Sequence, residues 1–82
     1  MFKAKIFIKR RRTILDPQGK AVELGIKSLG FQNVSNVRVD KYIELEINED
    51  DEEKAKVEIE KICNSLLANP HLEDYFFELE KL

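Results

Sequence analysis

The sequence is poor in the residue types from which cross-links, metal sites and nucleotide-binding loops are built. Its 82 residues include one cysteine, one histidine, three glycines, two prolines and no tryptophan. One cysteine excludes an intramolecular disulfide, and one histidine beside it offers no metal-ligand spacing. Three glycines leave none of the glycine-rich loops that cradle phosphates. We therefore expect no cofactor or metal on this chain and no nucleotide chemistry of its own.

The two residues with the most chemical potential, Cys63 and His71, have simpler structural interpretations. Cys63 falls on the apolar stripe of an expected helix, which favours an inert position in the core. His71 follows Pro70 in an expected loop, where a solvated histidine is the commoner case. The pair does not form a nucleophile with its base. The acidic residues are numerous, but no two of them stand in an apolar setting that would separate their pKa values. Nothing in the sequence therefore indicates a catalytic set.

Long apolar runs are also missing. Met1 leads directly into alternating sequence, without an apolar stretch of signal-peptide length. No later run is long enough to cross a membrane as a helix. We expect a cytoplasmic protein without a membrane partner.

The charge balance does not favour nucleic-acid binding. Charged residues make up 37% of the chain, and the formal net charge is −2. The run Lys9-Arg10-Arg11-Arg12 is the exception: it is either an anion site helped by the following helix N-terminus or a solvated basic loop, and the loop is the commoner case. The aromatic motif with which RNA-binding sheets stack bases is missing. We expect no nucleic-acid partner and keep an RNA-binding module only as an alternative.

Hydrophobic periodicity predicts a strand and then a helix in the first 30 residues. Residues 2–9 alternate between apolar and mostly polar side chains, as in a half-buried strand. From Pro17 onward, Val22, Ile26 and Leu29 fall on one helical face. Gly30 is then placed to end the helix in a left-handed conformation.

The next stretch, residues 34–47, alternates for too long to be one strand. Val37 and Ile43 face the same side only if the segment folds back symmetrically about Asp40. We therefore expect a hairpin with an odd loop centred on Asp40, a residue type that tolerates a left-handed backbone.

The remaining sequence predicts a helix and a final strand. An acidic stretch, residues 49–53, suits a helix N-terminus, and Asn69-Pro70 suits its end. Residues 72–79 alternate again. The full order predicts an α+β, ferredoxin-like βαββαβ fold with a four-stranded antiparallel sheet and two helices on one face, in a single domain of residues 1–82. So small a domain often completes its core by association.

The predicted sheet leaves one face bare, and this face carries aromatic side chains. The expected topology puts the first strand between the third and the fourth, so Phe7 lies between Tyr42 and Phe76. Three aromatics on a charged face suggest self-association through the sheet, although single exposed aromatics are normal.

The segment ILDPQGKAV, residues 14–22, opens the first helix. Asp16 is a favourable N-cap, and Pro17 is favourable at the first helical position. Gly19 has no such role, since glycine within a helix costs about 1 kcal/mol relative to alanine. A close approach to its backbone would explain it.

Three segments together resemble the PurS family of small subunits of phosphoribosylformylglycinamidine (FGAM) synthase. They are ILDPQGKAV, LGFQNVSNVRVDKYIELEI and LLANPHLEDYFFELE, and they follow one another in the family's order and spacing over nearly the whole chain. Two positions depart from the family pattern. Asp40 replaces a common glycine, and His71 replaces an aliphatic residue.

The resemblance implies a non-catalytic subunit of a glutamine-dependent carbon–nitrogen ligase. It implies a glutaminase (PurQ-type) partner and an ATP- and magnesium-dependent synthetase (PurL-type) partner, which this subunit bridges while ammonia passes between them. It also implies a homodimer or homotetramer. The segment around Gly19 then becomes a candidate contact with a partner subunit, and Gly19→Leu is expected to harm assembly more than folding. The candidate contact residues are Leu15, Asp16, Pro17, Gln18, Gly19, Asn69 and Pro70.

A second class of function remains open beside this one. A free-standing regulatory or small-molecule-binding ferredoxin-like domain would use the acidic and basic loops as its ligand site.

Overall fold

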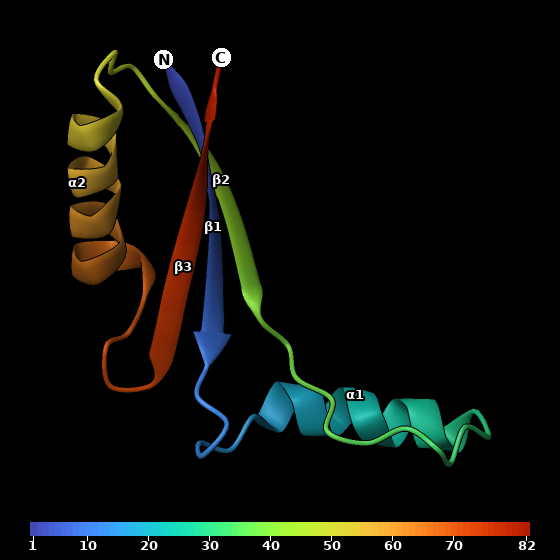
Figure 1. Cartoon of the computed structure of the whole chain (residues 1–82). Coiled ribbons are helices and arrows are strands. Elements are labelled where there is room, and N and C mark those ends of the chain that lie inside the picture. The colour runs from blue at the N-terminus through green and yellow to red at the C-terminus, as the bar shows by residue number, and fades with distance from the viewer.

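Three strands form one antiparallel sheet in the computed structural model, which describes residues 1–82. The strands are β1 (Phe2–Arg10), β2 (Lys41–Ile47) and β3 (Glu73–Lys81), in the spatial order β2-β1-β3 (Figure 1). Phe7 pairs with Tyr42 on one side and with Phe76 on the other. The predicted placement of the first strand is therefore confirmed.

The prediction of a fourth strand, and with it a hairpin around Asp40, is wrong. Residues 34–40 run without a sheet partner. The backbone N–H groups of Val37 and Val39 donate instead to the carboxylates of Glu23 and Asp16. The one non-glycine residue with a positive φ is Asn36, at 56°, and not Asp40. Alternation along the sequence could not show that helix side chains would take these donors.

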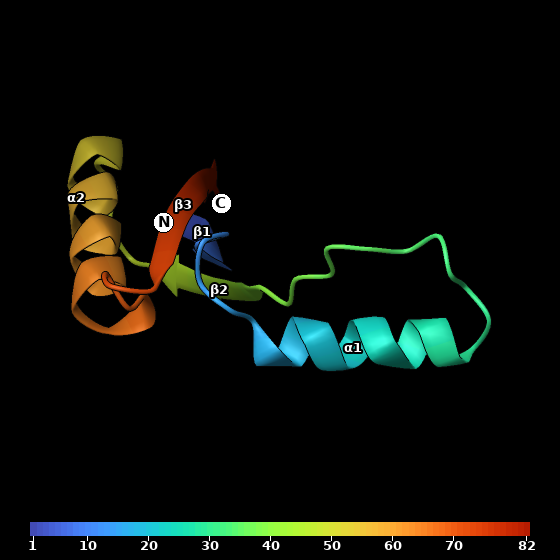
Figure 2. The same ribbon diagram turned by 90° about the horizontal axis from the view of Figure 1, so that it is seen from below.

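Helix α1 (Pro17–Ser28) begins and ends as predicted. Asp16 is its N-cap and Pro17 its first residue, while Gly30 follows its C-cap with φ 101°. Its position differs from the prediction, because α1 extends away from one end of the sheet instead of covering it (Figures 1 and 2). The expectation of two helices on one face is therefore wrong for the single chain.

Helix α2 (Glu52–Ile62) covers the sheet alone. Its N-cap is Asp51, whose side chain accepts a hydrogen bond from the backbone of Glu53. A π-helical turn, η1 (Cys63–Leu67), continues it, and Ala68 closes this turn by donating to the carbonyl of Cys63 at 2.9 Å. The predicted end near Asn69-Pro70 is confirmed.

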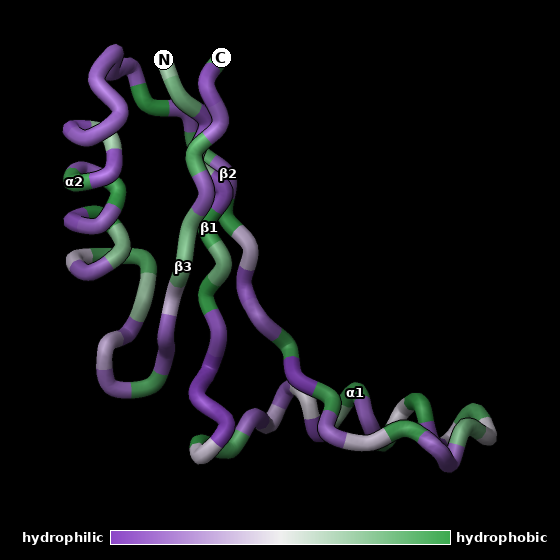
Figure 3. Tube along the Cα trace, in the orientation of Figure 1, coloured by the Kyte–Doolittle hydropathy of each residue, from purple (hydrophilic) through white to green (hydrophobic).

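The core lies between β1 and α2. Alternate residues of β1 point inward and lose nearly all their exposure, and the tube of Figure 3 shows the same alternation in hydropathy. Cys63 is fully buried, as predicted, and burial raises the pKa of its thiol. The fully buried members are Ala4, Ile6, Ala55, Ile59 and Cys63, with Ile8 nearly so.

The single chain is elongated for its size. Its Cα radius of gyration is 16.3 Å, with extents of 50 × 27 × 15 Å, whereas a compact domain of this length has a radius near 12 Å. The difference comes from α1 and the extended segment that returns beside it, residues 17–40, which we call the arm (Figure 2). Only ten of the 82 residues are buried, so the sheet and α2 form a small core.

Candidate partner-contact site

The two predicted contact segments lie at the same end of the sheet. Leu15–Gly19 begin α1, and Asn69 and Pro70 lie in the loop before β3. Arg11 connects the two regions: its backbone N–H donates to the carbonyl of Leu72 at 3.0 Å, and its Nη2 donates to that of Pro70 at 2.8 Å. Arg11, which follows β1, therefore fastens the loop of Pro70 to the beginning of the β1–α1 connection.

Asp16 ties the start of α1 to the returning segment. The residue is 5% exposed, Oδ1 accepts from the backbone of Gly19 at 2.9 Å, and Oδ2 accepts from that of Val39 at 2.9 Å. The Val39 and Gly19 hydrogen bonds lower the pKa of Asp16, and the charges of Arg38 and Arg10 lower it further. The predicted helix cap is confirmed, and the bond to Val39 is one that sequence reasoning missed.

The returning segment comes close to α1 at Gly19. A Cβ atom at this position would collide with the carbonyl oxygen of Val37 and would lie 2.9 Å from Oδ2 of Asp16. A close approach to the backbone therefore does explain the glycine. The approaching group belongs to the same chain, so Gly19 is not needed to explain a partner contact.

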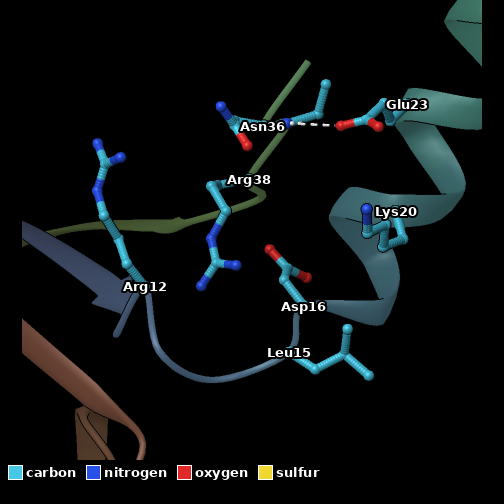
Figure 4. A pocket seen from close by; sticks show the side chains of 8 residues that line it. Arg12, Leu15, Asp16, Lys20, Glu23, Asn36 and Arg38 are labelled. Carbon is cyan, nitrogen blue, oxygen red and sulfur yellow. Dashed lines mark hydrogen bonds between the residues drawn. The ribbon is translucent and has the colours of Figure 1, made fainter.

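Arg38 is a further residue that sequence reasoning missed. Its Nη2 donates to the carbonyls of Arg11 at 2.8 Å, Ile14 at 3.0 Å and Arg10 at 3.4 Å, and its buried Nε has no partner. The loop that connects β1 to α1 curves around this guanidinium, which holds the loop through the three carbonyls (Figure 4). An arginine between two valines was the only signal available. We call Asp16, Gly19, Val37, Arg38 and Val39 the arm base.

A hollow of about 130 Å³ opens beside the arm base. The hydrogen bond from Val37 lowers the pKa of Glu23, and the nearby lysines Lys20 and Lys27 act in the same direction. Both carboxylates of the hollow therefore stay ionised near neutrality, and no serine, threonine, cysteine or histidine side chain lines it. The site can hold and orient a neighbouring surface. Its lining residues are Arg12, Leu15, Asp16, Lys20, Glu23, Asn36, Val37 and Arg38 (Figure 4).

Other predicted contact residues line a second hollow of about 300 Å³. Pro17 and Gln18 border it from the start of α1, and Asp40 and Lys41 border it from the start of β2. Leu15, at the other hollow, is 67% exposed. The exposed side chains of this region are available for a partner, whereas Asp16 and Gly19 are occupied within the chain.

The basic run is mostly engaged within the chain. Lys9 lies 5.8 Å from the ring centroid of Phe76, Arg10 donates to the carbonyl of Leu15 at 3.1 Å, and Arg11 pairs with Asp74 at 3.1 Å. These contacts give the run a structural role at the end of the sheet.

The aromatic row on the bare sheet face forms as predicted. The rings of Phe7 and Phe76 are stacked at 4.7 Å, and Tyr42 is tilted against Phe7 at 4.9 Å. Tyr42 and Phe76 remain about half exposed. Ion pairs flank the row, Lys3 with Glu44 at 3.4 Å and Lys5 with Glu80 at 3.3 Å.

The two departures from the family pattern lie in exposed loops. Asp40 and His71 are both exposed, and the backbone of His71 donates to Oδ1 of Asn69 at 3.0 Å. Neither disturbs the arm base.

No group of three or more histidine, cysteine, aspartate or glutamate side chains is arranged to hold a metal ion. Neither helix has the length and apolar character that a membrane span requires.

Comparison with known proteins places this fold in one family. A family model described as "PurS: Phosphoribosylformylglycinamidine (FGAM) synthase" matches residues 3–81. The chain is 39% identical over 82 residues to the phosphoribosylformylglycinamidine synthase subunit PurS of Methanocaldococcus jannaschii, with 100% of this chain and 99% of that protein covered. It is 41% identical over 81 residues to the same subunit of Synechocystis, with 99% and 81% covered.

Solved structures agree over the arm as well as the sheet. Bacillus subtilis PurS superposes with a TM-score of 0.90 at 38% identity, covering 99% of this chain and 100% of that one. A chain in the structure of PurLQS from Thermotoga maritima gives a TM-score of 0.86 at 32% identity, with 96% of both chains covered. The chain belongs to the PurS family of FGAM synthase subunits.

Proposed function

We propose that this chain is the small, non-catalytic subunit of an FGAM synthase in de novo purine biosynthesis. The observation that carries the proposal is the likeness, over 96% of both chains, to a chain in the PurLQS structure. The absence of a catalytic set at either hollow fits a subunit that acts by contact.

The complete enzyme converts formylglycinamide ribonucleotide and glutamine to formylglycinamidine ribonucleotide and glutamate, with ATP. In this proposal the PurQ-type subunit releases ammonia, and the PurL-type subunit uses ATP and magnesium to activate the amide oxygen that ammonia displaces. Ammonium has no free lone pair, so ammonia must reach the second site without meeting bulk water. Subunits held in register exclude water from the route and place the reactants.

The exposed residues at the end of the sheet are the proposed contact with these partners. Leu15 and Gln18 border the hollows beside α1, and Pro70 lies in the neighbouring loop that Arg11 fastens. Two segments at one end of the sheet, one of them fastened by Arg11, suit a bridge, because a bridge must fix the relative positions of two larger subunits. The place of action is the cytoplasm.

We also propose that the chain forms a homodimer or homotetramer and that the aromatic row contributes to it. Tyr42 and Phe76 are half exposed, and Phe7 lies between them, stacked on Phe76 and tilted against Tyr42. Burial of aromatic surface releases about 25 cal/mol per Å² of apolar area, so a shared row favours association.

A reconstitution experiment tests the bridging role. Purified PurL-type and PurQ-type subunits are assayed for glutamine-driven amidine formation with and without this chain, and complex formation is followed by sedimentation. Turnover driven by added ammonia checks that the synthetase is intact. We expect this chain to raise glutamine-driven turnover and to bring the subunits into one complex. If neither changes, the bridging proposal fails.

A matched pair of variants locates the contact. Leu15→Asp changes an exposed side chain at the proposed contact, and Val57→Asp changes a similarly exposed side chain on α2. We expect Leu15→Asp alone to weaken the complex. Equal binding by both variants would contradict the assignment of the contact to this end of the sheet.

A further inference from the structure

Arg12 is the one member of the basic run whose charge is not used within the chain. It is exposed, and its guanidinium forms no hydrogen bond, ion pair or cation–π contact. Its side chain lies beside Arg38 along the hollow at the arm base (Figure 4). An arginine carries five N–H donors in a planar fork and keeps its charge at physiological pH. The donors of Arg12 are therefore available to an acceptor from outside the chain.

Two more cationic side chains with unused donors line the same hollow. Lys20, on the first turn of α1, forms no ion pair, although its charge lowers the pKa of Glu23. Arg38 uses Nη2 for three carbonyls, whereas its Nη1 and its buried Nε donate no hydrogen bond. Figure 4 shows Arg12 and Lys20 on either side of Arg38. Three cationic side chains from three separate segments of the chain therefore border one hollow.

The two carboxylates of the hollow are already engaged. Both oxygens of Asp16 accept backbone hydrogen bonds. Glu23 accepts one from Val37 through Oε1, and its Oε2 lies 3.6 Å from Nζ of Lys27, which is outside the hollow. Neither carboxylate forms an ion pair with a cationic side chain of the hollow. The three cations therefore remain without an anionic partner.

The charge balance of the hollow indicates which kind of anion fits it. Three cationic side chains and two carboxylates leave a surplus of one positive charge. A carboxylate carries one negative charge and neutralises this surplus. A phosphate group is close to a dianion at neutral pH, so it would leave an excess negative charge beside two carboxylates. The volume of about 130 Å³ accommodates one carboxylate group and a few water molecules. The balance therefore favours a single carboxylate.

The rim of the hollow favours a carboxylate that belongs to a protein. Leu15 lines the hollow and is 67% exposed, and Val37 lines it in a half-buried position. An exposed leucine gains nothing from a small soluble acid, but it can pack against the residues that flank an acidic side chain on a protein surface. Arginine is enriched in protein interfaces, where its paired bonds to a carboxylate strengthen as water is excluded.

We propose that the hollow beside the arm base receives one acidic side chain, an aspartate or a glutamate, of a partner subunit. Arg12 and Lys20 bind the carboxylate from either side, and Nη1 of Arg38 faces it while Nη2 holds the loop. Leu15 packs against the residues next to the acidic one. The inference rests on the proposed bridging function and deepens it, because it names the chemical group that a partner presents at this end of the sheet.

The test measures the binding of charge variants to the purified PurL-type and PurQ-type subunits by calorimetry. Arg12→Gln and Lys20→Gln each remove one cation of the hollow. Lys81→Gln is the matched control, because Lys81 is exposed, has no ion pair and pairs with Phe2 at the opposite end of the sheet. We expect the dissociation constant to rise about tenfold in Arg12→Gln and about threefold in Lys20→Gln, and to stay unchanged in Lys81→Gln. The effect of Arg12→Gln should shrink as added salt screens the charges.

The outcomes separate this inference from the bridging function. If the unchanged chain binds its partners and Arg12→Gln binds them as tightly as Lys81→Gln, the carboxylate site is overturned and the bridging function stands. If the unchanged chain binds neither partner, both fail. Titration of the free chain with inorganic phosphate is the further control. Phosphate binding that depends on Arg12, with partner binding unaffected by Arg12→Gln, would overturn the proposal in favour of a free anion. Circular dichroism checks that the variants remain folded.

Discussion

At Gly19 the two halves of the arm lie close together. Its missing side chain lets the carbonyl of Val37 approach the first turn of α1, and the carboxylate of Asp16 fills the remaining space. Gly25 lies in the same helix with open space around the position of a Cβ atom. The two glycines therefore respond differently to the same substitution.

Gly19→Ala should destabilise the protein, because the new methyl group forces the returning segment away from α1. Gly25→Ala should stabilise it by about 0.5–1 kcal/mol, since alanine is the better helix former and meets nothing. Denaturant unfolding of both variants measures the difference. If both substitutions raised the free energy of unfolding, helix propensity, and not the approach of Val37, would decide the outcome at Gly19.

Asp16 should make the arm sensitive to acid. Its hydrogen bonds lower its pKa below the ordinary value near 4, so the unfolded chain binds a proton more readily than the folded chain. The stabilisation that ionised Asp16 provides is complete when the pH is above the ordinary pKa of aspartate. It is lost as the pH falls through the lower pKa that Asp16 has in the folded chain. The pKa values of Glu23 and Glu73 are lowered as well, and a backbone hydrogen bond is the largest cause in each case.

Asp16→Asn isolates this effect. An amide has one acceptor oxygen and no charge, so it cannot reproduce both backbone hydrogen bonds of the carboxylate. We expect lower stability at pH 7 and a shallower loss of stability between pH 5 and pH 2 than in the unchanged chain. Thermal unfolding across that range measures both. If the stability of Asp16→Asn fell with pH as steeply as that of the unchanged chain, the acid sensitivity would belong to the other carboxylates.

At the scale of elements, the aromatic row is the surface proposed for self-association. Phe7→Lys and Phe76→Lys each place a charge in the row on the bare face, while the helix-covered core is left intact. We expect both to weaken self-association, as measured by sedimentation. Val57→Lys, on the exposed side of α2, serves as the matched control. Unchanged sedimentation of both row variants would remove the row from the interface.

The elements also show which features a single sequence can predict. Caps, helix stops and the alternation of β1 depend on neighbours within a few positions, and Asp16, Gly30 and the placement of Phe7 were predicted correctly. The returning segment was not, because its alternation is that of a strand while its donors are taken by Asp16 and Glu23. Arg38 was missed because its three acceptors come from a distant connection.

At the scale of the whole molecule, the small core makes stability depend on assembly. With ten buried residues and an extended arm, the single chain has little apolar burial to offset its conformational entropy. We expect the melting temperature to rise with protein concentration, since association stabilises the folded state by mass action. Calorimetry over a hundredfold range of concentration measures this rise. A constant melting temperature would indicate that the monomer is stable alone.

The ion pairs on the bare sheet face have a consequence for how two such faces can stack. Lysines run along the central strand β1, and acidic residues run along β2 and β3 on either side. If two copies stacked these faces with their strands parallel, the lysines of one β1 would lie over the lysines of the other, and the acidic residues would lie over acidic residues. If one face is turned until the strands cross steeply, each basic stripe passes over the two acidic stripes of the other. Stacked sheets adopt either a small angle or one close to 90°, and this striping favours the orthogonal arrangement.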